Sequence, residues 1–154
     1  MRYLEDLSVG EEVQFEGEYL VSEEEIIEVG RRWDPQPFHI DPVAAKQSVF
    51  GGLVASSAHI FSIWVSIGHA AVDKEKKVVS VSALGFNNLQ WHNPVRPNDV
   101  LRSGYKTLSI RESKSRPGLG IVTNRSKVTN QKGEKVFTLE CSFLVPKRDY
   151  KLSP

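Results

Sequence analysis

The stretch from Ser56 to Val72 reads SSAHIFSIWVSIGHAAV and is the most apolar part of the chain. On a helix its apolar side chains would cover most of the circumference, which is typical of a helix buried nearly all round. The apolar run within it falls far short of the roughly 20 residues that a bilayer-spanning helix needs. Its polar residues recur at intervals of three, four and three and share one stripe: His59, Ser62, Ser66 and His69. We expect one buried helix whose polar stripe faces water or another subunit.

The residues after this helix follow a strand pattern. Between positions 136 and 145, five side chains alternate strictly with their neighbours and belong to one face: Phe137, Leu139, Cys141, Phe143 and Val145. The segment NQKGE is typical of a tight turn between strands at about 119–129 and 135–145. A second turn, RPND, joins a strand that ends near Trp91 to one that begins near Val100. The pattern predicts four antiparallel strands in succession, a meander.

The residues before the long helix predict a strand and a first helix. A short strand falls at about 12–21, and Ser22 and Glu25 stand at the spacing of a capping box at a helix start. That helix, about Glu23 to Trp33, must end before Pro35, because a residue that precedes proline is pushed out of the α region. A single sheet must bury one face, and the long helix is available to cover it. The sequence therefore predicts an α+β fold, the hotdog architecture, with an antiparallel sheet wrapped around one helix in a single domain, residues 1–154.

Composition and charge exclude several classes of protein. The 154 residues are 40% hydrophobic and 25% charged, as in an ordinary soluble domain. The 20 Lys and Arg residues against 19 Asp and Glu are scattered, which argues against nucleic acid or a membrane surface as partner. The lone Cys141 has no partner for an internal disulfide, and the start MRYLEDLSVGEE lacks the pattern of a signal peptide. We expect a cytoplasmic protein.

The segment WDPQPFHID, residues 33–41, crowds two prolines, two carboxylates and an imidazole into nine positions. Asp34 and His39 are too close in sequence to meet across a strand and too irregularly spaced for a helix face. A bend held by Pro35 and Pro37 would bring the two side chains together, and the restricted prolines would lower its entropic cost. Asp41 precedes a proline and the short apolar run VAA, so it is expected to cap a short helix.

These residues resemble the MaoC-like hydratase family of hotdog enzymes, which includes the R-specific enoyl-CoA hydratases. The family's pattern of Asp, two residues, Pro, one residue, His, one residue, Asp is met by Asp34, Pro37, His39 and Asp41. The segments FGGLVAS at 50–56, LQWHNPVRPNDVL at 89–101 and LVPKR at 144–148 also resemble the family. The resemblance covers nearly the whole chain.

The resemblance implies a homodimeric enzyme that reversibly hydrates a 2-enoyl thioester of CoA, or of an acyl carrier, to a 3-hydroxyacyl thioester, with R specificity. It implies that Asp34 activates the water and that His39 positions the water and shuttles the proton, with no metal or organic cofactor. The backbone amides of Ser56 and Ser57 are candidate donors to the thioester oxygen, because N–H groups at a helix start are unpaired and partly positive. Phe38 is a candidate to line the acyl pocket. A homodimer would also protect the edge of the open sheet.

Two positions depart from the family pattern, and other readings stay open. Ser56 and Ser57 stand where well-studied hydratases have a His-Gly pair. The serine side chain in place of glycine narrows the site, so the size of the acyl group stays open. Asn98 replaces a common glycine, and Asn tolerates a left-handed backbone there. An acyl-CoA thioesterase on the same fold and a non-catalytic acyl-thioester binder are the rival functions. A metal site at His39, Asp41 and His59 matches no ligand spacing, and a Ser56, His59 and Asp34 triad lacks a nucleophile elbow.

Overall fold

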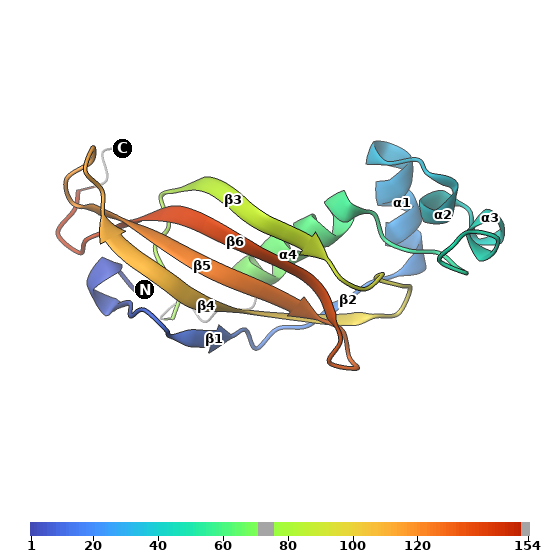
Figure 1. Ribbon diagram of the computed structural model, residues 1–154, viewed down its shortest axis with the longest axis horizontal. Coiled ribbons are helices and arrows are strands. Elements are labelled where there is room, and N and C mark those ends of the chain that lie inside the picture. Colours follow the sequence, from blue (N-terminus) through green and yellow to red (C-terminus); the bar gives the residue numbers. More distant parts are fainter. Residues whose placement is uncertain (71–75, 152–154) are drawn as a thin grey trace.

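A computed structural model describes residues 1–70 and 76–151 of the chain. Its elements in chain order are η1 (Leu4–Asp6), β1 (Glu12–Gln14), β2 (Tyr19–Leu20), α1 (Glu23–Trp33), α2 (Pro37–Ile40), α3 (Pro42–Lys46), α4 (Ser57–Ala70), β3 (Ser82–Trp91), β4 (Val100–Glu112), β5 (Leu119–Thr129) and β6 (Lys135–Pro146). The long strands form one curved sheet with α4 behind it, while α1, α2 and α3 gather beyond one end (Figure 1). The predicted α+β fold is confirmed.

The sheet has the strand order β1-β4-β5-β6-β3 with antiparallel neighbours, and β2 pairs with β4. Strands β4, β5 and β6 form the predicted meander. The prediction that β3 precedes them in the same meander is wrong, because β3 pairs with β6 at the far edge. The segment between β3 and β4 therefore crosses the end of the sheet instead of forming a hairpin. Pairing with β6 places Phe86 of β3 edge-on to Phe61 and Trp64 of α4.

The core lies between α4 and the sheet. Three isoleucines of α4 are almost fully buried, Ile60, Ile63 and Ile67, at 4, 2 and 3% exposure. They join one apolar cluster with residues of β4, β5 and β6, among them Leu101, Val128, Phe137 and Leu139. The burial of this face holds the helix on the sheet. Among the residues that the structure describes, no helix is long and apolar enough to cross a membrane.

The expectation of a helix buried nearly all round is only partly met. Ser62, Ser66 and His69 are exposed and Val65 is 37% exposed, so one side of α4 faces out in the single chain. The fourth member of the predicted polar stripe, His59, is instead 2% exposed. The predicted last turn, Ala71 and Val72, lies outside the described residues.

The elements before α4 match their predicted positions, with local differences. The predicted first strand is split into β1 and β2, and α1 spans Glu23–Trp33 as expected. The Ser22 hydroxyl accepts a hydrogen bond from the Glu25 amide at 3.1 Å, which is one half of the predicted capping box. The Glu25 carboxylate is used elsewhere, since it accepts a hydrogen bond from the Tyr19 hydroxyl. Trp33, the last residue of α1, is 60% exposed, and Arg32 lies over its ring.

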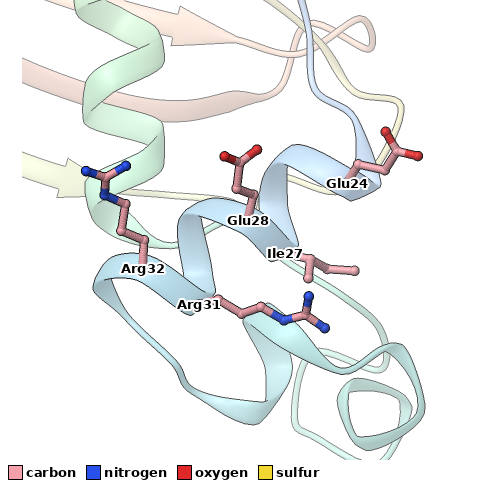
Figure 2. Close-up of a pocket in the computed structure, with 5 residues that line it drawn as sticks. All are labelled: Glu24, Ile27, Glu28, Arg31 and Arg32. Carbon is pink, nitrogen blue, oxygen red and sulfur yellow. The ribbon is translucent and has the colours of Figure 1, made fainter.

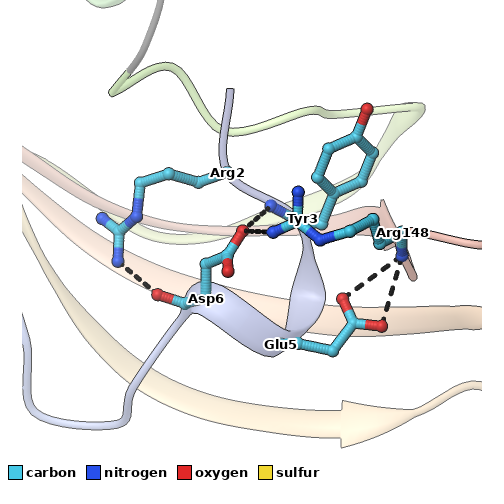
Figure 3. A network of polar contacts seen from close by, with 5 residues as sticks. All are labelled: Arg2, Tyr3, Glu5, Asp6 and Arg148. Carbon is cyan, nitrogen blue, oxygen red and sulfur yellow. Dashed lines mark hydrogen bonds and ion pairs between the residues drawn. The ribbon is translucent and has the colours of Figure 1, made fainter.

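A polar network ties the two ends of the described chain (Figure 3), and the N-terminal segment lies at the other end of the sheet from α1 (Figure 1). The Asp6 carboxylate accepts hydrogen bonds from the Tyr3 amide at 2.8 Å and from the Arg148 guanidinium at 2.6 Å. The Tyr3 amide, followed by Arg148, lowers the pKa of Asp6. The Arg148 amide donates to both Glu5 oxygens, and its guanidinium lies over the Tyr3 ring. These contacts fasten η1 to the segment after β6.

Candidate active site

The motif segment joins the end of α1 to a one-turn helix, α2. Asp34 is the C-cap of α1, where its amide donates to the Gly30 carbonyl at 2.9 Å. Gln36 is extended, with φ −69° and ψ 141°, as expected for a residue before proline. Pro37 then occupies the first turn of α2, a position that suits its fixed φ and missing N–H. The predicted bend therefore includes a one-turn helix at 37–40, and His39 lies on it.

Gly30 lets α2 pack directly against α1. A Cβ at this position would lie 3.0 Å from three atoms: the His39 Cβ, the His39 carbonyl oxygen and Ile40 Cγ2. Such distances are well inside ordinary carbon contacts of about 3.5–4.0 Å. The bare backbone of Gly30 therefore sets how close His39 comes to the helix that ends in Asp34.

Asp34 and His39 face each other as the sequence predicts. His39 Nε2 lies 3.5 Å from Asp34 Oδ2, and the side chains are 8% and 38% exposed, respectively. His39 Nδ1 lies 2.7 Å from the Val54 carbonyl oxygen. Because a carbonyl oxygen only accepts, Nδ1 carries a hydrogen. In its neutral form the ring then has its lone pair on Nε2, the nitrogen that lies beside the carboxylate.

His39 Nε2 and Asp34 Oδ2 can share one water molecule after a small movement. Two hydrogen bonds of about 2.8 Å from a single water place their acceptors about 4.4 Å apart. The observed 3.5 Å between Nε2 and Oδ2 is shorter, and a small rotation of the half-exposed Asp34 side chain would open it. The pair can therefore hold a water by both of its hydrogens and accept a proton from it.

A cavity of about 610 Å³ adjoins the pair. Its polar lining is Asp34, Gln36, His39, Ser57, His92 and Asn93, and its apolar lining is Phe38, Phe50, Val54, Ala55, Ile60, Trp91 and Pro94. Phe38 lies edge-on to His39, with ring centroids 4.5 Å apart, and 5.1 Å from Phe50. Phe38 is thus at the cavity wall, and its contact with an acyl group stays a prediction. The mixture of one apolar wall and a few converging polar groups is typical of a small-molecule site.

Ser56 and Ser57 are placed differently by the start of α4. Ser57 lines the cavity, whereas Ser56 is 1% exposed and outside the lining. The Ser56 hydroxyl accepts a hydrogen bond from the His59 amide at 3.2 Å and so caps α4. Within residues 1–70 and 76–151, the amides of Ser56 and Ser57 take part in no hydrogen bond. The structure brings Ser57 to the candidate site and gives the Ser56 side chain a structural role.

Among the cavity residues that the sequence did not indicate are Trp91, the last residue of β3, and His92 and Asn93, which follow it. His92 Nε2 lies 2.7 Å from the Thr138 hydroxyl of β6, and Trp91 packs against Phe137, with ring centroids 5.4 Å apart. Both contacts depend on the pairing of β3 with β6. The segment LQWHNPVRPNDVL contains these three residues, but the sequence singled it out only by its resemblance to the family and assigned none of the three to the site.

The other predicted positions have structural roles. Asp41 Oδ1 accepts from the amides of Val43 at 2.8 Å and Ala44 at 3.2 Å, which confirms the predicted cap. Asn98 has φ +70°, which confirms the expected left-handed backbone. The Arg96 guanidinium donates to the Phe50 carbonyl at 2.7 Å, so it ties the RPND segment to a cavity wall. In the described part of the chain, no three His, Cys, Asp or Glu side chains gather as metal ligands would.

A second hollow, of about 510 Å³, lies on the outer surface of α1 (Figure 2). Ile27 forms its apolar part, and two acids and two bases surround it: Glu24, Glu28, Arg31 and Arg32. None of the predicted site residues lines it. The charges of opposite sign at i and i+3 or i+4 are typical of a solvated helix surface.

The curved sheet around α4, with a carboxylate and an imidazole at an apolar cavity, defines a hotdog-fold protein. Residues 6–130 match the MaoC like domain, so the chain belongs to the MaoC-like family. An uncharacterized protein of Bacillus subtilis, YdeM, is 30% identical over 129 residues, which are 81% of this chain and 86% of that protein. The crystal structure of a MaoC-like dehydratase from Rhodospirillum rubrum superposes with a TM-score of 0.86 at 35% identity, covering 97% of this chain and all of that one.

A relative with a named substrate matches a smaller region. Mesaconyl-CoA hydratase of Cereibacter sphaeroides is 34% identical over 70 residues, which are 46% of this chain and 20% of that protein. The chain thus corresponds to a small part of that enzyme.

Proposed function

We propose that this protein is a hydro-lyase that reversibly adds water to a 2-enoyl-CoA thioester and forms a 3-hydroxyacyl-CoA. The single observation that carries the proposal is that Asp34 and His39, 3.5 Å apart, open onto the same cavity as the first residue of α4. The family membership and a relative that hydrates a CoA thioester support the reaction class. The R configuration of the product is the expectation from the R-specific members of the family.

In the proposed step, one water is held between His39 Nε2 and Asp34 Oδ2. The water oxygen attacks C3 of the enoyl group as one O–H bond breaks, and that proton passes to the pair. The developing imidazolium of His39 would be stabilised by the Asp34 carboxylate beside it and by the hydrogen bond from Nδ1 to Val54. The proton then passes from the pair to C2, so atoms and charge balance.

The negative charge that develops on the thioester oxygen needs hydrogen-bond donors. The Ser57 amide, at the start of α4 and at the cavity wall, is the proposed donor, and the adjacent Ser56 amide is a second. Removing one such donor typically costs about 3 kcal/mol of transition-state stabilisation. Because the donors belong to the backbone, the serines in place of the His-Gly pair are compatible with this role.

A homodimer is part of the proposal. Strand β3 is at the edge of the sheet. Three apolar side chains of β3 are exposed, Leu84, Phe86 and Trp91, with exposed fractions of 51, 41 and 45%, and Val81, just before the strand, is 39% exposed. An exposed apolar edge of this kind pairs readily with another chain. Light scattering at micromolar concentration is expected to give twice the chain mass, and Leu84→Glu is expected to weaken the dimer. A wild-type monomer would contradict this part of the proposal.

The test of the reaction is the hydration of crotonyl-CoA, followed by the loss of the enoyl thioester absorbance. The expected result is turnover by the wild type and a loss of about 100-fold or more in Asp34→Asn and His39→Ala. A thiol dye added to the same reaction separates the rival function, because a thioesterase would release free CoA. Equal rates in the wild type and both variants would refute the catalytic assignment.

A further inference from the structure

A second histidine–carboxylate pair lies between α1 and α4, outside the cavity. His59, in the first turn of α4, has its Nε2 3.2 Å from Oε1 of Glu25, in the first turn of α1. The same Glu25 oxygen accepts a hydrogen bond from the Tyr19 hydroxyl of β2. Three elements therefore meet in one polar cluster that the proposed reaction does not use.

His59 is held under unusual conditions for an imidazole. Its ring is 2% exposed, and among the residues that the structure describes neither ring nitrogen has an aligned hydrogen-bond partner. The distance from Nε2 to Glu25 is that of a hydrogen bond, but the angle is not, so the contact acts mainly through charge and dipole. A buried polar group that is incompletely paired costs stability. The contact with Glu25 is therefore the polar interaction that the described residues offer this buried ring.

We propose that His59 is a positioning residue that holds α1 against the start of α4, an inference that rests on the proposed function. The C-terminal end of α1 carries Asp34, and Gly30 of the same helix supports His39. The start of α4 carries Ser57, which lines the cavity, and the His59 amide is bound by the Ser56 hydroxyl. The contact of Glu25 with His59 thus joins the helix behind the acid–base pair to the helix behind the oxyanion donors.

The contact with Glu25 favours a hydrogen on His59 Nε2. This nitrogen lies 3.2 Å from the Glu25 carboxylate oxygen, and an N–H there is attracted to the carboxylate. His39 donates a hydrogen from Nδ1 to the Val54 carbonyl. Nitrogen NMR of the rings reports which nitrogen of each histidine carries a hydrogen.

The test compares His59→Gln with His59→Leu. The Gln side chain keeps an N–H donor that can reach Glu25, whereas Leu fills the space without one. With crotonyl-CoA, His59→Leu is expected to lower kcat about 10-fold and to leave KM within about twofold, since His59 does not line the cavity. His59→Gln is expected to recover most of that loss. Glu24→Gln, on the same helix turn and exposed, is the matched control and is expected to behave as the wild type.

Ring-nitrogen NMR provides the readout that does not depend on turnover. In the wild type we expect the hydrogen of His59 on Nε2, and in His59→Leu we expect a shift of the His39 ring signals that is absent in Glu24→Gln. If the wild type hydrates no enoyl-CoA, the proposed function fails, and the His39 signals still decide whether His59 positions the pair. If His59→Leu fails to fold, Glu25→Gln takes its place, because the Glu25 side chain is 31% exposed. Unchanged kcat together with unchanged His39 signals would overturn the inference.

Discussion

Substitution of Gly30 by alanine tests whether the close approach of α1 and α2 sets the Asp34–His39 geometry. The new Cβ would meet the His39 Cβ, the His39 carbonyl oxygen and Ile40 Cγ2, each at 3.0 Å. To restore ordinary carbon contacts, α2 must move away by about 0.5 Å or more. One of the three atoms is backbone, so a side-chain rotation alone does not relieve the contact. His39 would move with α2, while Asp34 stays with α1.

Two opposing terms determine the stability of Gly30→Ala. Alanine in a helix interior is favoured over glycine by about 1 kcal/mol. Overpacking at a tight contact costs about 1–3 kcal/mol. The contact is expected to win, with a net loss of about 1 kcal/mol in the free energy of unfolding, measured by urea denaturation. The activity is expected to fall more steeply, by about 10- to 100-fold, because a small displacement of a catalytic group is amplified in the rate.

Gly68→Ala is the matched control. Gly68 also lies within a helix, α4, and a Cβ there would meet only Phe15 Cε2, at an ordinary 4.0 Å. This substitution is expected to stabilise the protein by about 0.5–1 kcal/mol and to leave crotonyl-CoA hydration unchanged. If Gly30→Ala were as stable and as active as Gly68→Ala, the argument that Gly30 spaces the site would be refuted.

Three further predictions follow from individual groups. Burial, the hydrogen bond to Glu25 and the Glu25 charge raise the pKa of Tyr19 to about 12. The stabilising effect of the Tyr19 phenol is therefore complete below pH 10 and is lost as the pH rises toward 12. An alkaline absorbance titration should show one phenol that ionises after the others, and Tyr19→Phe should remove that step. The Tyr3 amide and Arg148 lower the pKa of Asp6, so its contribution is present above the ordinary carboxyl range and is lost on acidification; the acid branch of the stability curve should be flatter in Asp6→Asn. Asp41→Ala removes the acceptor for two α3 amides and should cost about 1 kcal/mol in urea denaturation, whereas equal stability would contradict the cap.

Local signals predicted the first helix and the acid–base pair. The bounds of α1 were predictable because Ser22 caps its start and Pro35 excludes its continuation, both within a few residues of the ends. The meeting of Asp34 and His39 was predictable for the same reason, since five residues and two prolines leave the side chains little freedom to separate. What the local signals missed was that Pro37 begins a helix, because a four-residue helix has no hydrophobic period to detect.

The partner of β3 could not be predicted, because strand pairing depends on residues far apart in the chain. The RPND segment has the composition of a turn, and a turn between two strands favours a hairpin. In the structure its Asn98 amide donates to the Val21 carbonyl at 2.8 Å, and Arg96 reaches the Phe50 carbonyl, so the segment is held by two distant loops. These contacts hold the segment between β3 and β4 where it crosses the end of the sheet.

This crossing also explains why one part of the cavity lining was not predicted. Because β3 lies beside β6, its last residue, Trp91, and the next two, His92 and Asn93, reach the cavity that Asp34 and His39 line. The acid–base pair comes from one local segment, whereas the wall opposite it exists only after the sheet has formed. The two residues of the proposed reaction therefore both lie in WDPQPFHID, and we propose that Trp91, Phe38 and Phe50, which line the cavity, limit the size of the acyl group. Substitution of these aromatic residues should change which acyl length is preferred and should leave the type of reaction unchanged.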